Sequence, residues 1–182
     1  MIPLLSLYSS ATATKSQKSI PLDIFLDGIR DGRWQDIVLP IRTIQDKAER
    51  DARKKNAPCV TPAGLFKVRK DDGVEQHSGI IAVDIDDVDD TEELKSLLCT
   101  DPRVLAAFVS ISGRGLCVLY RINPARHREA FAGISDFLYE QHKVIADPTS
   151  VNISRLRFVS YDPHLYHNQN AEKFTNYPKT KP

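Results

Sequence analysis

The chain has 182 residues, of which 41% are hydrophobic and 27% are charged. This is the ordinary composition of one soluble globular domain. The formal net charge is only +1 at pH 7, so a surface for a polyanion must come from local clustering of the 25 Lys and Arg residues. The cysteines Cys59, Cys99 and Cys117 lack the spacing of a zinc site and the even count of a disulfide framework. No apolar run approaches the roughly 20 residues that cross a bilayer, so we expect a cytoplasmic protein without membrane contact.

The N-terminal third predicts a strand and two helices. Residues 2–7 form an apolar strand, a loop rich in Ser, Thr and Lys follows, and residues 20–32 form a short amphipathic helix. Residues 41–55 place Ile41, Ile44 and Ala48 on one stripe and most of their basic side chains elsewhere, which predicts a helix with a basic face. Charged faces are usually only solvated, so this face alone does not indicate nucleic-acid binding.

The remaining elements predict the fold class. Residues 61–69 and 78–86 have strand composition, and the turn Asp71-Asp72-Gly73 between them suggests a hairpin. Further elements are expected as helices at 91–98 and 124–143 and as strands at 104–111, 116–122 and 156–160. Helices and strands mix without a regular βαβ alternation. The predicted class is therefore α+β, with a mixed, largely antiparallel sheet, packed helices and a single domain over residues 1–182.

Residues 79–86 form an apolar strand that ends in two carboxylates, Asp84 and Asp86. Residues at i and i+2 of a strand point to the same face. Two adjacent carboxylates repel each other, and a divalent hard cation removes that conflict. Mg²⁺ takes one or two protein carboxylates and leaves its other positions to water and phosphates. The alternative is a solvated strand end that runs into the acidic loop 87–90.

Two other interpretations of the acid pair fit the sequence less well. A calcium loop that begins at Asp84 would have Val88 at position 5 and Asp89 at position 6, where an oxygen ligand and glycine are required, so that geometry fails. The run Asp84 to Val88 also resembles the nucleophile motif of haloacid-dehalogenase-type phosphatases. That motif normally lies near the chain start, and no later GDxxxD-type acid pair follows here, so this phosphatase stays a distant alternative.

Two later segments offer groups for phosphate. The turn Ser112-Gly113-Arg114-Gly115 joins two predicted strands, and its glycines let the backbone approach a phosphate beside Arg114. Arg155 and Arg157 lie at i and i+2 of a predicted strand and so share a face, after an isolated acid, Asp147. The alternatives are an ordinary hairpin turn and an Asp-Pro turn.

The order of these features resembles the archaeo-eukaryotic primase superfamily, whose three motifs are an acid pair, a small-residue strand and a third acid. It is similar in particular to the VirE-associated N-terminal domain family, found ahead of primase-helicase modules in mobile elements and phages. The resemblance covers about residues 22–168. The further matches are Ile41-Arg42, Ala57-Pro58, Gly64-Leu65-Phe66, His77-Ser78-Gly79 and Ser160-Tyr161-Asp162-Pro163.

The resemblance implies a metal-dependent nucleotidyltransferase of the DNA primase-polymerase type with an RRM-like catalytic core. Its Mg²⁺ or Mn²⁺ would be held by three catalytic acids, Asp84, Asp86 and Asp147. The expected nucleotide-binding residues are Ser112, Arg114, Arg155 and Arg157. The expected partners are nucleoside triphosphates, a single-stranded DNA template or primer, and a helicase domain, since the chain is expected to be the N-terminal part of a longer primase-helicase protein.

One position departs from the primase pattern. Where many primase-polymerases have a histidine in the second motif, this chain has Cys117. A thiol is a poor phosphate donor, so the rival hypothesis is a catalytically degenerate domain that binds nucleic acid or a helicase partner. If Cys117 faces Asp84 and Asp86, it stands where the histidine would. If it points into an apolar layer, it is a packing residue.

Overall fold

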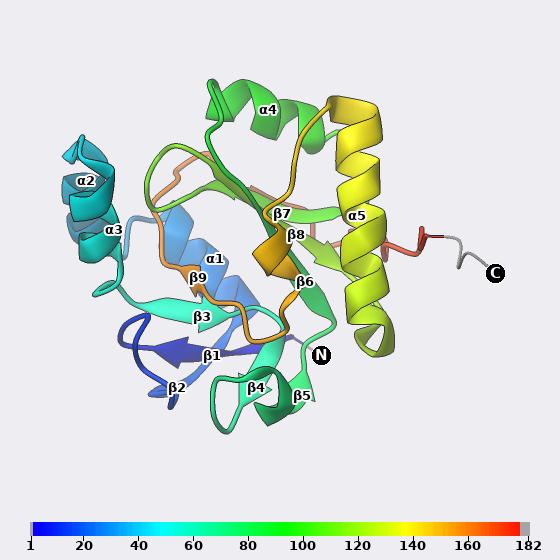
Figure 1. The fold of residues 1–182 in the computed structure, drawn as a ribbon, viewed down its shortest axis with the longest axis horizontal. Coiled ribbons are helices and arrows are strands. Elements are labelled where there is room, and N and C mark those ends of the chain that lie inside the picture. The colour runs from blue at the N-terminus through cyan, green and yellow to red at the C-terminus, as the bar shows by residue number, and fades with distance from the viewer. Residues whose placement is uncertain (1, 179–182) are drawn as a thin grey trace.

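The fold consists of two four-stranded sheets, a small hairpin and flanking helices (Figure 1). The computed structural model describes residues 2–178. The first sheet has the order β2-β1-β3-β9, with β1 at Leu4–Tyr8, β2 at Lys18–Pro21, β3 at Cys59–Thr61 and β9 at Arg157–Phe158. The second sheet has the order β10-β7-β8-β6, with β6 at Ile80–Ile85, β7 at Val104–Val109, β8 at Leu116–Arg121 and β10 at Tyr166–His167.

All pairings between the named strands are antiparallel, which confirms the predicted α+β class. The hairpin joins β4 at Gly64–Phe66 to β5 at Val74–His77. The helices of the described residues are α1 at Leu22–Arg30, α2 at Gln35–Thr43, α3 at Lys47–Lys54, α4 at Thr91–Leu98 and α5 at His127–His142. Short 3₁₀ turns lie at Asp71–Gly73, Pro124–Arg126 and Pro148–Val151. No helix in residues 2–178 is both long and apolar enough to cross a bilayer.

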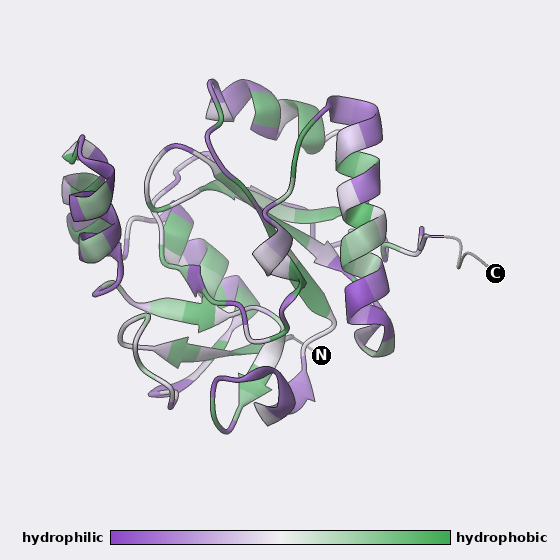
Figure 2. Ribbon diagram, in the orientation of Figure 1, coloured by the Kyte–Doolittle hydropathy of each residue, from purple (hydrophilic) through white to green (hydrophobic). Residues whose placement is uncertain are grey.

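The second sheet is buried on both faces, and the alternation along β6 assigns its residues to the two sides. Ile81 and Val83 join a cluster with α4 and α5, whereas Ile80 and Ala82 join a cluster with α1 and the first sheet. The strands are correspondingly hydrophobic in Figure 2. Asp84 has the parity of Ile80 and Ala82, so its carboxylate lies on the face that looks toward the first sheet. The fold therefore places an acid between the two sheets.

The predicted helix at 41–55 is wrong as a single helix. The chain leaves α2 at Ile44, which has extended dihedral angles, and begins α3 after Asp46. The Asp46 carboxylate accepts a hydrogen bond from Glu49 N at 2.8 Å, an N-cap contact that favours a new helix start. Pro40, which lacks a backbone N–H, lies inside α2. Local capping overrides the continuous apolar stripe.

The predicted hairpin between residues 61–69 and 78–86 is also wrong. The turn at Asp71–Gly73 joins β4 to β5, while β6 pairs with β8, more than 30 residues later in the chain. Gly79, with φ of 77°, lies between β5 and β6 and redirects the chain. The two segments have strand composition, but the partner of β6 is chosen by packing in the second sheet.

A buried ion pair anchors the end of β7, from which the loop toward the site begins. Lys95 Nζ of α4 lies 2.8 Å from Asp162 Oδ2, and both side chains are at most 5% exposed. The same carboxylate oxygen accepts a hydrogen bond from Val109 N at 2.8 Å. Lys95 also reaches the exposed Glu92 at 2.9 Å. The pair links α4, β7 and the segment after β9.

Replacing Lys95→Met should lower the free energy of unfolding by about 3–5 kcal/mol, because it leaves Asp162 as a buried charge without its cation. The matched change Glu92→Gln removes the exposed partner of the same lysine and should cost less than about 1 kcal/mol. Denaturant unfolding of both variants measures the difference. Equal losses in the two variants would show that the buried pair has no special role.

A second buried contact joins two histidines at the start of α5. Gly79 N donates to His77 Nδ1 at 3.0 Å, so the proton of neutral His77 is on Nε2, which lies 3.0 Å from His127 Nδ1. Burial lowers the pKa of His77, and burial together with the charge of His77 lowers the pKa of His127 to about 4. Both rings are therefore neutral near pH 7.

Because its folded pKa is below the value of about 6.5 in an unfolded chain, His127 binds protons more readily after unfolding. Stability should be full above pH 6.5 and should fall as the pH is lowered toward 4. Between pH 7.5 and pH 5 the loss from His127 should be about 2 kcal/mol. The variant His127→Asn, which retains an acceptor for His77, should show a smaller loss over the same interval. A wild type and variant with identical pH profiles of unfolding would contradict this.

Candidate functional site

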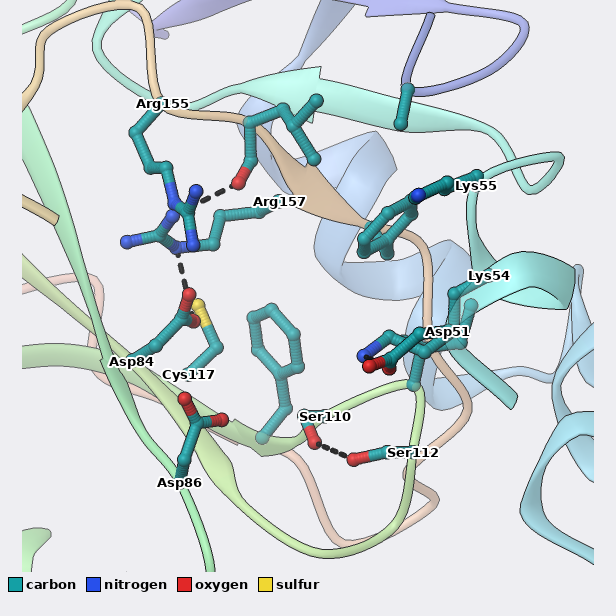
Figure 3. A pocket seen from close by; sticks show the side chains of 15 residues that line it. Asp51, Lys54, Lys55, Asp84, Asp86, Ser110, Ser112, Cys117, Arg155 and Arg157 are labelled. Atoms are coloured by element: carbon teal, nitrogen blue, oxygen red, sulfur yellow. Dashed lines mark hydrogen bonds and ion pairs between the residues drawn. The ribbon is translucent and has the colours of Figure 1, made fainter. Parts of the chain in front are cut away.

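A cavity of about 440 Å³ lies between the two sheets and contains the acid pair of β6 (Figure 3). Asp84 and Asp86 line one wall, and Arg155 and Arg157 face Asp84 from the segment that enters β9. Apolar side chains complete the lining, namely Phe108, Ile111, Leu156 and Phe158. The volume is within the range of roughly 300–1,000 Å³ for small-molecule sites. The cavity combines charge of both signs with apolar surface.

Asp84 is held in place by a cation from the other sheet. Arg157 Nε lies 3.1 Å from Asp84 Oδ1, and the side chains of the two residues are 4% and 22% exposed. Burial raises the pKa of Asp84, the charge of Arg157 opposes the rise, and the negative charge of Asp86 adds to it. Arg157 therefore offsets the cost of an ionised carboxylate in an apolar setting.

Both terminal nitrogens of Arg157 make hydrogen bonds within the protein. Its Nη2 donates to the Ala82 carbonyl oxygen and to Ser150 Oγ, the latter at 2.8 Å. Ser150 Oγ in turn accepts a hydrogen bond from Asp84 N at 3.2 Å. Arg157 lines the cavity as predicted, but these contacts fit a residue that positions Asp84 better than one that binds phosphate. Ser150 was missed at the sequence level, since an isolated serine in a turn carries no signal.

The backbone of Asp147 is hydrogen-bonded to that of Asp84, but the Asp147 side chain does not line the cavity. Its N–H donates to the Asp84 carbonyl oxygen at 2.8 Å, and its carboxylate accepts from Thr149 N at 2.9 Å and from Thr149 Oγ1 at 2.6 Å. Arg155 Nη2 lies 3.0 Å from Asp147 Oδ2. Burial raises the pKa of Asp147, but the hydrogen bonds from Thr149 and the charge of Arg155 outweigh it, so the pKa is lowered. The metal-binding role of Asp147 stays a prediction.

Cys117 faces the acid pair. On β8 it stands directly opposite Asp84 of β6, and residues paired in this way point to the same face. Its sulfur lies beside the Asp84 carboxylate in Figure 3, and the side chain lines the cavity although it is only 2% exposed. Burial and then the charge of Asp84 raise the pKa of the thiol. Cys117 also belongs to the apolar cluster that contains Phe108 and Leu119, so it both borders Asp84 and packs in the core. Its correspondence to the histidine of the primase motif stays a prediction.

The turn after β7 carries two more predicted residues. Ser112 lines the cavity, and its hydroxyl oxygen is hydrogen-bonded to that of Ser110 at 3.0 Å. Arg114 lines a smaller, neighbouring cavity instead. Arg42 of α2 braces this turn by donating to the Ser110 carbonyl oxygen at 3.0 Å and packing against Gly113, whose φ is 75°. At the sequence level, Arg42 stands out only as part of a resemblance motif and has no assigned role.

Helix α3 supplies the wall opposite the acid pair. Asp51, Lys54 and Lys55 line the cavity across from Asp84 and Asp86 (Figure 3). The sequence singled out the basic face of this segment but not Asp51, whose carboxylate is paired with Lys54 at 3.0 Å. Their approach to β6 depends on the break between α2 and α3, which the apolar pattern did not predict.

The donor set of the cavity fits a magnesium or manganese ion. Asp84 and Asp86 both present carboxylates to it, and Mg²⁺ is commonly bound by one or two protein carboxylates with water and phosphate in its other positions. Within residues 2–178, no group of three or more His, Cys, Asp and Glu side chains has the arrangement of a complete metal site. A metal here would therefore depend on ligands from water or substrate.

The ion pair between the sheets can be tested by mutation. Arg157→Met should lower the free energy of unfolding by about 3–5 kcal/mol, because it leaves Asp84 and the Ala82 carbonyl without their partner. Adding Asp84→Asn removes the uncompensated charge and should recover at least about 1 kcal/mol. Urea unfolding of the single and double variants measures the coupling. If the two losses simply add, the pair does not hold the sheets together.

Comparison with known proteins gives one match. A family model described as BT4734-like, N-terminal domain, matches residues 52–167. The matched segment includes Asp84, Asp86, Cys117, the turn after β7 and the segment that enters β9. No curated protein and no solved structure matches the chain. Because the model spans well over half of the residues, the chain belongs to the BT4734-like N-terminal domain family.

Proposed function

We propose that this domain is a metal-dependent nucleotidyltransferase of the DNA primase-polymerase type, acting in the replication of a mobile element or phage. The observation that carries the proposal is a cavity in which an acid pair, cationic side chains and an apolar wall meet. A nucleoside triphosphate combines a flat base with a polyanionic chain that binds divalent metal. The apolar side chains of the cavity can contact the base, and its carboxylates and cations can bind the metal and the phosphates. The resemblance to the VirE-associated N-terminal domain family supports the same activity.

The roles of the residues follow from their exposure. Arg155 is 40% exposed at its side chain and lines the cavity, so it can exchange Asp147 for a phosphate. Ser112 and Lys54 also line the cavity and can donate to phosphate oxygens. The ring of Phe108 or Phe158 offers an apolar surface to the base.

The proposed reaction joins a hydroxyl to the α-phosphate of the triphosphate. The hydroxyl oxygen forms a new bond to the α-phosphorus, and the bond from that phosphorus to the oxygen bridging to the β-phosphate breaks. Pyrophosphate leaves with the bonding electrons, and the hydroxyl proton passes to water. The protein contributes positioning and cationic groups, because most of the charge that develops is on phosphate oxygens.

Asp84 and Asp86 are the residues that would hold Mg²⁺ or Mn²⁺, with Asp147 as a third acid once Arg155 turns to a phosphate. The ion would supply positive charge to the phosphate oxygens and to the attacking hydroxyl. Arg157 opposes the burial-driven rise in the pKa of Asp84 and orients its carboxylate. The proposed partners are a single-stranded DNA template or primer and a helicase domain.

A second candidate retains nucleic-acid binding without catalysis. Two observations favour it: Arg157 already occupies one oxygen of Asp84, and Cys117 stands beside that carboxylate in place of a cationic ring. In that case the cavity would bind a nucleotide or strand without turnover. Incorporation of nucleotides by the wild-type domain separates the two candidates.

Asp86→Asn should reduce magnesium-dependent primer extension by at least about 100-fold, because it removes a ligand charge that matters most in the transition state. Since Asp86 is exposed, the variant should unfold at the same temperature as the wild type. The control is Asp89→Asn, an exposed acid of the same loop that lines neither cavity, and it should keep full activity.

Cys117→His adds a test of the same site. If the second motif needs an imidazole, this variant should bind magnesium triphosphate more tightly than the wild type in a calorimetric titration. A wild-type domain that binds neither magnesium triphosphate nor primer, with no gain in Cys117→His, would overturn the nucleotidyltransferase proposal.

A further inference from the structure

A second, smaller cavity of about 180 Å³ adjoins the first. The two share four lining residues, Asp51, Lys54, Asp86 and Ser112. Its volume is below the range of roughly 300–1,000 Å³ that encloses a whole small molecule. It can therefore take only part of a ligand, such as one phosphate and its sugar in a longer strand. The shared wall means that groups in the two cavities meet at Asp86.

Helix α3 gives the smaller cavity a regular row of side chains. Lys47, Arg50, Asp51 and Lys54 line it, at positions i, i+3, i+4 and i+7, which form one face of a helix. Arg53 points off this face and lines neither cavity. The cavity is thus built by one stripe of the helix and not by its general basic charge.

The cations of this row differ in their contacts. Lys54 is neutralised by Asp51 at 3.0 Å. Lys47 is exposed, and among the described residues no carboxylate lies within salt-bridge distance of it. Arg114 enters from the opposite side, on the turn after β7, where its Nη2 donates only to the Gln45 side chain, at 3.3 Å. Lys47 and Arg114 therefore flank the cavity with charge that is available to an anion.

Arg50 adds a buried donor to the lining of the smaller cavity. It is 5% exposed, and its Nη1 donates to the carbonyl oxygens of Ile44 and Gln45 at 2.9 and 3.2 Å. Its Nε is buried and has no hydrogen-bond partner among the described residues, although Arg50 lines the cavity. A buried guanidinium N–H without an acceptor is costly, and an anionic oxygen would satisfy it.

We propose that the smaller cavity binds a backbone phosphate of the single-stranded DNA that accepts the new nucleotide, between Lys47, Arg50 and Arg114. The inference rests on the proposed function and divides its two substrates between two compartments. The triphosphate occupies the larger cavity and the acceptor strand runs through the smaller one. Asp86, on the shared wall, is where the strand's terminal hydroxyl meets the α-phosphate.

The test measures two affinities in parallel. Anisotropy of a labelled oligothymidylate of about 12 nucleotides reports strand binding, and calorimetry reports magnesium triphosphate binding. Lys47→Ala and Arg114→Ala should each weaken strand binding about three- to tenfold and make its log–log salt dependence shallower by about 0.7. Both should leave triphosphate affinity within about twofold. Arg155→Ala should show the reverse pattern.

Arg53→Ala is the matched control, because it removes the same charge from the same helix outside both cavities. It should change neither affinity. A loss of strand binding in Arg53→Ala equal to that in Lys47→Ala would show diffuse attraction to the helix and overturn the proposal. An equal loss of both ligands in Arg114→Ala would also overturn it, since the two compartments would then be one.

The two proposals fail in different ways. Selective loss of strand binding in Lys47→Ala and Arg114→Ala, together with no triphosphate binding in the wild type, would support the strand site and contradict the nucleotidyltransferase. If triphosphate binding depends on Asp86 and strand affinity is unchanged in Lys47→Ala and Arg114→Ala, the nucleotidyltransferase proposal is supported and the strand site is overturned.

Discussion

The ion pair between Arg157 and Asp84 is the contact on which the candidate site depends. Each residue belongs to an edge strand, β9 of the first sheet and β6 of the second. An edge strand has unpaired backbone groups, and Arg157 covers one of them at Ala82 while it neutralises the carboxylate two residues later. A buried guanidinium is tolerated only when several acceptors surround it. Those acceptors bring the two sheets together and leave the cavity beside them.

The same ion pair makes Asp84 and Asp86 unequal. Asp84 is largely buried and one of its oxygens faces Arg157, whereas Asp86 is exposed beyond the strand end. Asp84 therefore has a fixed orientation and little freedom, while Asp86 can adapt to what enters either cavity. A metal shared by the pair would combine one rigid and one adaptable ligand. The proposed strand site places its reacting hydroxyl beside the adaptable one.

The wall opposite the acids depends on contacts that lie outside the cavity. Two side chains hold the start of the turn after β7. Asp162 accepts a hydrogen bond from Val109 N, and Arg42 donates one to the Ser110 carbonyl oxygen. Helix α3 is fastened to the end of α2 by Arg50. Each of these contacts uses a buried or half-buried charged side chain to hold a backbone group, so the geometry of this wall follows from a few such hydrogen bonds.

The sequence by itself determined the α+β class and the strand that leads to Asp84 and Asp86, because periodicity of two or 3.6 residues and turn residues act over a few positions. It grouped Ser112 with Arg155 and Arg157 only through the resemblance to a known family. It did not determine that β6 pairs with β8 or that the helix predicted at residues 41–55 is interrupted before Asp46. It also did not determine that Arg157 forms an ion pair with Asp84. It also left the direction of Cys117 open and gave no role to Ser150, Arg50 or Asp51. These features are set by strand register and by the burial of charges from distant segments, and only the tertiary structure supplies those partners.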